Sequence, residues 1–430
     1  MTQISDAHVL DDFAWRGLVA VSTDLDALRE ALNAGPVTYY CGFDPTAPSL
    51  HLGNLVQILT LRRLQDAGHR PLALVGGATG LIGDPKDTAE RKLNDPHVVG
   101  AWVERIKRQV EPFLDFSGER AEHAAIMVNN LDWTAKLSAI DLLRDVGKHF
   151  RVNKMLAKDA VSARLSSDEG ISYTEFSYQI LQGMDFLELY RRYGCTLQTG
   201  GSDQWGNLTA GLDLIHRAEG VSVHAMATPL ITKADGSKFG KTESGTVWLD
   251  PDMTSPYAFY QFWINADDES VISYLKIFSL RPRPEIEALA AAVAERPAAR
   301  EAQRELAIEL TTLVHGAMEC DRVVAASAAL FGRAELADLD EATLAAALAE
   351  TGVAVVTGDS PLSVVELLVA TGLVDSKSAA RRAVAEGGAY VNNVKATDPE
   401  AGIEPSAFLH GRWLVVRRGK RSVAGVRVGG

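Results

Sequence analysis

The chain has 430 residues, 47% of them hydrophobic, and a formal net charge of −13. A chain of this length and composition can bury a large core, and its length predicts roughly two to four domains. It has no basic N-terminal region followed by an apolar stretch, and no run of about 18 apolar residues that could cross a bilayer. We therefore expect a cytoplasmic, globular protein without membrane contact.

Cysteine usage and charge distribution further limit the kinds of site and partner that the sequence predicts. Cys41, Cys195 and Cys320 show no C-x-x-C spacing, so neither a disulfide framework nor a structural zinc site is predicted. Residues 361–430 carry ten Lys and Arg against six Asp and Glu, a net charge of +4, which leaves −17 for residues 1–360. A small basic terminal segment suits contact with a polyanion, although the same balance is common on an ordinary solvated face.

Strand-like apolar runs alternate with helical patterns in the first half of the chain. The runs cover residues 37–43, 72–76, 125–129 and 195–199. This alternation predicts an α/β domain over residues 1–255, with a parallel sheet and crossover helices. Between His51 and Gly68 the apolar side chains recur at helical spacing, so the histidine is expected to open a helix.

The pattern changes in the second half. Long amphipathic runs rich in Ala, Leu, Glu and Arg predict an all-helical domain over residues 256–333. Residues 334–360 are acidic and alanine-rich, and we interpret them as a linker that contains a helix. Residues 361–430 predict two short helices, a Gly387-Gly388 turn and strands, which make a small α+β domain.

Two short segments suit phosphate binding. His51-Leu52-Gly53-Asn54 lies at a strand-to-helix junction, where free backbone N–H groups and the helix dipole favour an anion and glycine permits close approach. In the second segment, Lys238 and Lys241 flank Phe239-Gly240 and are followed by Thr242, so both lysines can converge on one polyphosphate. Taken singly, the first segment is also an ordinary helix start and the second a routine surface turn.

Two polar clusters lie between these segments. Tyr178, Gln182 and Asp185 recur at intervals of four and three residues, so on a helix they lie close to one face and can point into one pocket. The alternative is a solvent-facing polar stripe, but apolar neighbours favour partial burial, and a buried carboxylate requires a partner. Gly201, Asp203 and Gln204 follow a strand, as ligand-binding loops do at the carboxyl edge of a doubly wound sheet.

Together with Tyr40-Cys41-Gly42-Phe43-Asp44-Pro45-Thr46, these segments resemble the tyrosyl-tRNA synthetases of the bacterial type, which are class I enzymes. K-F-G-K-T is similar to the class I signature in a variant common among tyrosine enzymes. The resemblance covers nearly the whole chain. It implies a Rossmann-like doubly wound catalytic domain, an anticodon-side helical domain over 256–333, an S4-like RNA-binding domain over 361–430, and a homodimer.

The resemblance also implies a role for each matching residue. The side chains expected to act on the reacting phosphates are His51, Lys238, Lys241 and Thr242. Those expected to bind tyrosine are Tyr40, Asp84, Tyr178, Gln182, Asp185 and Gln204, with Tyr40 and Asp185 at the phenol. The ATP site is expected to comprise Cys41, Gly42, Asp44, Thr46, His51, Gly53, Asn54, Gly201, Asp203, Lys238 and Lys241. Residues expected to contact tRNA are Lys377, Arg381, Arg382, Arg417, Arg418 and Lys420.

The implied reaction has two steps: tyrosine and ATP form tyrosyl-adenylate and pyrophosphate, and tRNA then accepts the tyrosyl group. ATP is expected to bring Mg²⁺ with it, and no tightly bound cofactor or protein metal site is expected. Arg91, which follows Asp84 in the sequence, is a further candidate for a role in adenylate formation. A tryptophan enzyme would share H-L-G-N but lack the pair Tyr40 and Asp185. An RNA-binding relative without activity would show gaps in the nucleotide site, and the sequence shows none.

Overall fold

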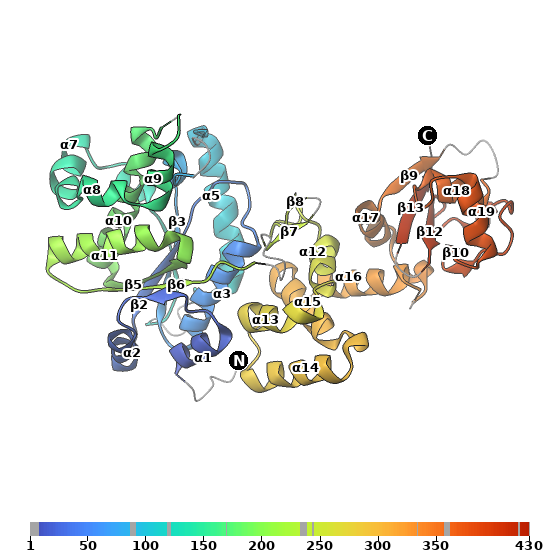
Figure 1. The fold of residues 1–430 in the computed structure, drawn as a ribbon, viewed down its shortest axis with the longest axis horizontal. Helices are drawn as coiled ribbons and strands as arrows, with labels where there is room; N and C mark the ends of the chain where they lie inside the picture. The colour runs from blue at the N-terminus through green and yellow to red at the C-terminus, as the bar shows by residue number, and fades with distance from the viewer. Residues whose placement is uncertain are drawn as a thin grey trace. The chain divides into compact units, whose positions relative to one another are not determined.

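Figure 1 shows the fold of the chain as a computed structural model. It describes residues 8–86, 92–117, 122–168, 170–232, 239–242, 245–332, 334–356, 362–419 and 422–429. The chain divides into two compact units. Unit 1 comprises residues 1–253 and 267–302, and unit 2 comprises residues 254–266 and 303–430.

The sheet of unit 1 confirms the predicted α/β architecture. In the described part of the chain its strand order is β1-β6-β5-β2-β3-β4. The strands are β1 (Val21–Ser22), β2 (Thr38–Phe43), β3 (Arg70–Val75), β4 (Ile126–Asn129), β5 (Cys195–Gly201) and β6 (His224–Thr228). All pair in parallel except β1, which pairs antiparallel with β6. The sequence prediction contained the four adjacent strands β5, β2, β3 and β4 and missed β1 and β6.

Strand β2 is where the direction of the winding changes. From β2 the chain proceeds to β3 and β4 on one side, and β5 and β6 lie on the other. Tyr39 and Tyr40 alternate across this strand, as neighbouring side chains on a strand must. The Tyr39 hydroxyl bonds to the Leu61 carbonyl of the helix on one face, whereas Tyr40 joins the core cluster on the other. In open α/β sheets ligands bind beyond the strand ends at such a switch point.

Helices cover both faces of this sheet. They are α1 (Val9–Arg16), α2 (Leu25–Ala34), α3 (Leu52–Asp66), α4 (Thr79–Ile82), α5 (Pro96–Val110), α6 (Leu131–Thr134), α7 (Ala139–Asp141), α8 (Val152–Leu156), α9 (Asp159–Leu165), α10 (Tyr173–Tyr193) and α11 (Trp205–Glu219). Helix α3 begins after His51, as predicted. Helices α10 and α11 pack on each other and on β5 (Figure 1). The short strands β7 (Lys241–Thr242) and β8 (Gly245–Thr246) form a hairpin.

The regular elements described between residues 256 and 332 are helices. They are α12 (Pro256–Ile264), α13 (Asp268–Phe278), α14 (Arg283–Glu295), α15 (Glu301–His315) and α16 (Ala317–Leu330), with a short 3-10 turn between α14 and α15. The boundary between the units runs through this segment. Helices α13 and α14 belong to unit 1, whereas α12 and α16 belong to unit 2. The predicted boundary between residues 255 and 256 therefore does not coincide with the boundary between the units.

Unit 2 contains a second sheet near the C-terminus, with strand order β11-β10-β12-β13-β9. Its elements are α17 (Glu341–Thr351), β9 (Val353–Val356), α18 (Val364–Ala370), α19 (Lys377–Ala385), β10 (Ala389–Val391), β11 (Val394–Lys395), β12 (Trp413–Arg418) and β13 (Ser422–Val428). The predicted linker 334–360 is corrected here. Its helix exists as α17, but β9 pairs in parallel with β13 and belongs to the sheet. Leu344 and Leu348 of α17 are also fully buried.

The C-terminal sheet also contacts the end of α16. Asn392 and Asn393 form the turn between β10 and β11, both with positive φ, a conformation that asparagine tolerates better than most residues. The Asn393 side chain donates to the Ala329 carbonyl at 2.6 Å, and Arg417 donates to the Phe331 carbonyl at 3.2 Å. The Ala329 carbonyl also accepts from the Gly332 N–H at 3.1 Å, so Asn393 adds a second donor to it, whereas Arg417 bonds the carbonyl of the residue that ends the helix.

Candidate functional site

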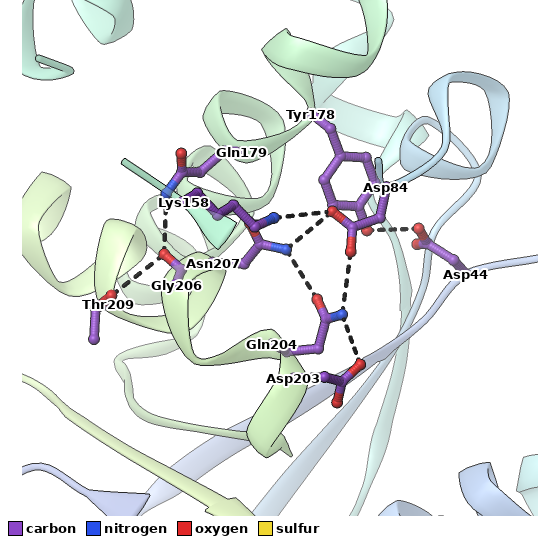
Figure 2. Close-up of polar contacts among 10 residues, drawn as sticks. All are labelled: Asp44, Asp84, Lys158, Tyr178, Gln179, Asp203, Gln204, Gly206, Asn207 and Thr209. Carbon is purple, nitrogen blue, oxygen red and sulfur yellow. Dashed lines mark hydrogen bonds and ion pairs between the residues drawn. The ribbon is translucent and has the colours of Figure 1, made fainter. Parts of the chain in front are cut away.

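Polar side chains gather at the carboxyl ends of β2 and β5, where the sheet changes winding direction. Asp44, just after β2, accepts hydrogen bonds from the Tyr178 hydroxyl and from the Thr79 hydroxyl, each at 2.6 Å. Tyr178 comes from α10, so this contact joins the helix to the strand end (Figure 2). The predicted nucleotide residue Asp44 and the predicted tyrosine residue Tyr178 thus meet directly.

Asp84 lies at the centre of a second group of polar contacts (Figure 2). Its carboxylate contacts the Lys158 ammonium at 3.2 Å, Asn207 at 3.3 Å and Gln204 at 3.1 Å. Gln204 also donates to Asp203 at 3.2 Å, which brings three predicted residues together. The position is able to hold an ammonium group, because one already lies there. Lys158 and Asn207 were not assigned by sequence reasoning, although Asn207 ends the G-G-S-D-Q-W-G-N segment.

Asp185 is buried on α10, with 2% of its surface exposed. One carboxylate oxygen accepts from the Asn130 amide and the other from the Trp133 indole, both at 2.9 Å. Burial raises the pKa of Asp185 to about 7, although both of these hydrogen bonds lower it. Each oxygen retains a lone pair, so the carboxylate can still accept a hydrogen bond from a ligand hydroxyl.

Two buried polar atoms near this end of the site have no partner among the described residues. They are the Tyr40 hydroxyl and the Gln182 side-chain oxygen. Burial and the charge of Asp185 raise the pKa of Tyr40 well above its usual value. Leaving a buried polar group unpaired costs about 1–3 kcal/mol, and native structures avoid it. A hydroxyl between Tyr40 and Asp185 would remove this cost for the Tyr40 group.

Asn130 connects the carboxylates of Asp185 and Asp44 through hydrogen bonds. Its amide nitrogen donates to Asp185 and also to Thr79 at 2.9 Å, and Thr79 in turn donates to Asp44. Its oxygen accepts from the Ala78 backbone at 2.7 Å, which fixes the orientation of the amide. Sequence reasoning missed Asn130, Trp133 and Thr79. Their positions just beyond β4 and β3, at the carboxyl edge of the sheet, are the signal that could have found them.

His51 caps the N-terminus of α3 in a reciprocal arrangement. The Gly53 N–H donates to His51 Nδ1, and the His51 N–H donates to the Asn54 side chain, both at 3.1 Å. Burial lowers the pKa of His51, and the charge of Lys241 lowers it further. The ring is therefore neutral at pH 7, and because Nδ1 accepts, the proton is on Nε2. Nε2 can donate to an anion at the helix N-terminus.

The two predicted phosphate segments are in contact. They are linked through Val247: the Leu52 N–H donates to the Val247 carbonyl, and the Val247 N–H donates to the Gly240 carbonyl. Gly240 has a φ of +72°, and a Cβ built on it would lie 3.3 Å from the Leu52 Cβ. A side chain there would be strained and crowded. Exposed Lys241 is thereby placed close enough to His51 to affect its pKa.

Lys238 and Arg91 lie outside the described residues, and so does the side chain of Thr242. Cys41 is buried, and burial raises the pKa of its thiol to about 12, so it cannot act as a nucleophile. Gly42 lies between Cys41 and Asp44, and Thr46 lies beyond Asp44 and donates its N–H to the Asp44 carbonyl at 2.8 Å. Gly201 approaches Asp203 so closely that a Cβ would lie 2.4 Å from the carboxylate.

A pocket of about 1260 Å³ opens beside the Asp84 cluster. It includes Asp84 and Gln204 but neither Asp185 nor His51, so it extends the site away from the phenol end. Its charged and aromatic lining residues are Asp84, Lys86, Phe150, Arg151, Lys154, Lys158, Asp203, Trp205, Asp213 and Arg217. Three of the five cations in this lining are paired with carboxylates: Lys158 with Asp84, and Lys154 and Arg217 with Asp213. Lys86 and Arg151 give the lining its excess of positive charge, and Phe150 and Trp205 offer rings on which a base could stack.

The residues predicted to contact tRNA differ in accessibility. Lys377, Arg381, Arg382 and Arg418 are exposed, on α19 and β12. The assignment of Arg417 is corrected, because only 9% of its surface is exposed. Its guanidinium stacks over the Tyr390 ring at 4.5 Å and donates to the end of α16. Lys420 lies outside the described residues.

Comparisons with known proteins match both parts of the chain. The family of class I tRNA synthetases (W and Y) matches residues 32–332, and a tyrosine–tRNA ligase SYY-like C-terminal domain matches residues 345–424. The second match begins inside α17, in agreement with the place of β9 in the C-terminal sheet. In the described residues, no helix is long and apolar enough to cross a membrane, and no group of three or more His, Cys, Asp or Glu could hold a metal ion.

Curated relatives match along nearly their full length. A tyrosine–tRNA ligase of Acidothermus cellulolyticus is 69% identical over 98% of this chain and 100% of its own length. One of Streptomyces griseus is 67% identical over 98% of this chain and 99% of its own. A solved C-terminally truncated mitochondrial tyrosyl-tRNA synthetase of Coccidioides posadasii is 34% identical, with a TM-score of 0.64, over 73% of this chain and 90% of that one. The chain therefore belongs to the tyrosine–tRNA ligase family of class I aminoacyl-tRNA synthetases.

Proposed function

We propose that this chain joins L-tyrosine to tRNA in two steps. In the first, a tyrosine carboxylate oxygen bonds to the α-phosphorus of ATP, the bond to the β-phosphate bridging oxygen breaks, and pyrophosphate leaves. In the second, a hydroxyl of the 3′-terminal ribose of tRNA attacks the tyrosyl carbonyl carbon, and AMP leaves. The observation that carries the choice of amino acid is the buried, unpaired Tyr40 hydroxyl near Asp185.

The proposed site would recognise both ends of the tyrosine substrate, its phenol hydroxyl and its ammonium group. Tyr40 and Asp185 would bond the phenol hydroxyl, and an amino acid without that hydroxyl would leave both groups unpaired in a buried place. At the other end, Asp84 would hold the substrate ammonium, with Tyr178, Gln182 and Gln204 around it. Support for this end comes from the Lys158 ammonium, which lies 3.2 Å from the Asp84 carboxylate.

The nucleotide would lie along the ends of β2 and β5 and reach the start of α3. Asp203 would bond the ribose, and Cys41, Gly42, Asp44, Thr46, Gly53, Asn54 and Gly201 would line the remaining path. His51 and Lys241, together with Lys238 and Thr242, would stabilise charge on the departing pyrophosphate. Mg²⁺ would accompany ATP, because phosphate oxygens are ligands that it prefers. No cofactor beyond this complex enters the proposal.

tRNA would contact unit 1 and the C-terminal domain. Its 3′ end would enter through the pocket beside Asp84, where Lys86 and Arg151 suit phosphates and Trp205 suits a stacked base. Lys377, Arg381, Arg382, Arg418 and Lys420 of the C-terminal domain, which we propose to be S4-like, would contact phosphates elsewhere. We further propose a cytoplasmic location, in keeping with a substrate that serves translation.

Replacing Arg381 and Arg382 together by Gln is expected to weaken tRNA binding about tenfold at low salt. The slope of log affinity against log salt should also become shallower, by about one for each phosphate that is no longer bound. Filter binding between low and physiological salt measures both quantities. Arg29→Gln, on α2 in unit 1, is the control and should change neither. An unchanged slope in the double variant would remove these residues from the proposed RNA surface.

ATP–pyrophosphate exchange with Mg²⁺ and without tRNA tests the first step. Exchange is expected with tyrosine, and not with phenylalanine or tryptophan at the same concentration. Exchange driven by tryptophan would overturn the roles of Tyr40 and Asp185. No exchange with any amino acid would instead favour an RNA-binding relative that has lost activity.

Tyrosine affinity is expected to fall with pH below about 7. The raised pKa means that Asp185 is largely protonated below pH 7 and ionised above it, and an ionised carboxylate is the better acceptor for the substrate hydroxyl. With a pKa of about 7, the dissociation constant at pH 6 should be about ten times that at pH 8. Equilibrium dialysis at pH 6, 7 and 8 measures this. Asp185→Asn should show weak binding without the pH dependence.

We also propose that the chain forms a homodimer through unit 1. Large apolar side chains are exposed on consecutive elements from α7 to the start of α10: Ile140, Leu143, Val152, Leu156, Leu165 and Tyr173. Such a concentration is unusual for a monomer surface and is typical of an interface. Sedimentation equilibrium should give twice the chain mass, and Ile140→Asp should shift the chain toward the monomer.

A further inference from the structure

Phe239 lies between the two lysines of the second phosphate segment, and its ring packs on one helix. The ring centroid is 5.0 Å from that of Tyr274 and 5.3 Å from that of Phe278, and the second pair is stacked with an interplanar angle of 26°. Both partners belong to α13, and both are buried. The chain leaves this contact at Gly240, which rests against Leu52 at the start of α3.

Helix α13 is itself held firmly at its C-terminal end. Arg16 of α1 donates to the Lys276 and Ser279 carbonyls at 3.0 and 2.9 Å. Arg63 of α3 donates to the Ile277 and Ser279 carbonyls, both at 2.8 Å. Both arginine side chains are buried, and cations are favourable at a helix C-terminus. Tyr274 and Phe278 are therefore a fixed support for the ring that packs on them.

These contacts connect α3, α13 and residues 239–240 in a closed ring. Helix α3 begins at His51, and Arg63 lies twelve positions further along it, roughly 18 Å away. Arg63 donates a hydrogen bond to α13, Phe278 of α13 packs on Phe239, and the neighbouring Gly240 lies against Leu52 at the start of α3. One helix thus fixes both the histidine at its start and, through α13, the aromatic side chain beside the signature lysine.

We propose that Phe239 is a positioning residue for adenylate formation. Its ring, anchored on α13, fixes the position of the Gly240–Lys241 backbone relative to His51. Lys241 and His51 can then both stabilise charge on the same departing pyrophosphate. Phe239 does not touch the substrate. The inference rests on the proposed function, since it assigns a purpose to the geometry of that site. A displacement of reacting groups by about 1 Å can cost a factor of about 100 in rate.

Phe239→Ala is expected to lower the single-turnover rate of adenylate formation about 30- to 100-fold, a misplacement effect of the size expected for about 1 Å. The dissociation constants of tyrosine and ATP should change less than threefold, because no binding group is removed. Phe239→Leu, which keeps part of the packing, should recover most of the rate. Phe113→Leu is the matched control: it shortens a buried ring of the same unit, in the 3-10 turn after α5, and should leave the rate unchanged.

A double-variant cycle separates positioning from general destabilisation. Phe239→Ala and Phe278→Leu should be non-additive in rate, because they break the same contact, whereas Phe239→Ala and Phe113→Leu should be additive. A Phe239→Ala protein that binds tyrosine normally and forms adenylate at the wild-type rate would overturn the inference. Loss of tyrosine binding in step with rate would also overturn it. If the wild-type protein catalyses no exchange, the proposed function itself fails.

Discussion

Replacing Asp185 by Asn is expected to weaken tyrosine binding by about 100-fold or more. The amide has one oxygen where the carboxylate has two, so its nitrogen must face Asn130 or Trp133, donor against donor. The substrate hydroxyl also loses an acceptor. A mismatch of this kind in a buried place costs about 3 kcal/mol, which corresponds to about 100-fold in affinity. Equilibrium dialysis with labelled tyrosine at pH 8 measures the effect.

Two further variants make that experiment specific. Asp145→Asn removes an exposed carboxylate from the same unit and should leave tyrosine affinity unchanged. Trp133→Phe removes only one of the two donors that orient Asp185, so its loss of affinity should be smaller than that of Asp185→Asn. ATP binding should be normal in all three proteins. A tyrosine dissociation constant within threefold of wild type for Asp185→Asn would contradict the assigned phenol site.

His51→Asn is expected to slow adenylate formation by about 100- to 1000-fold, the usual cost of removing one preorganised donor from a transition state. Asparagine is a good N-cap residue, so helix α3 should still begin correctly. What is lost is the ring donor at Nε2, which the shorter side chain cannot replace. Single-turnover formation of adenylate from saturating tyrosine and ATP measures the rate, and the tyrosine dissociation constant should remain unchanged.

The chain supplies its own control for this substitution. His8 caps α1 in the same way, with Nδ1 accepting from the Leu10 N–H at 3.1 Å, and it is not among the residues of the site. His8→Asn therefore repeats the exchange of a capping histidine without touching the chemistry, and should leave the rate unchanged. Equal rates in His51→Asn and wild type would show that His51 only caps the helix.

The sequence predicted the sheet because its central strands are apolar runs that end in glycine or polar residues. It did not predict β9, because Val353 to Val356 follow an acidic, alanine-rich helix and resemble the end of a linker. The length of that strand is four residues, and its partner β13 comes about seventy residues later. A pairing of such short strands over that separation leaves no mark in local sequence patterns.

The site was predictable where its residues share one element. Tyr178 and Asp185 are on α10, as their spacing predicted, and both are buried. Asn130 and Thr79 were missed because they come from different elements and meet only in the fold. Arg417 was misassigned for a related reason: a count of basic residues does not distinguish an arginine facing solvent from one that packs on a neighbouring helix. The roles of the site residues remain predictions.

The contact at the end of α16 bears on how this protein can be shortened. Removing the C-terminal sheet also removes Asn393 and Arg417, the side chains that bond the Ala329 and Phe331 carbonyls. In the fragment that remains, the Ala329 carbonyl would keep the Gly332 N–H, whereas the Phe331 carbonyl would have to bond water instead of Arg417. Removing the C-terminal domain therefore also changes the end of α16, and a comparison of activities between the full and the shortened chain measures this change together with the loss of the RNA-binding residues.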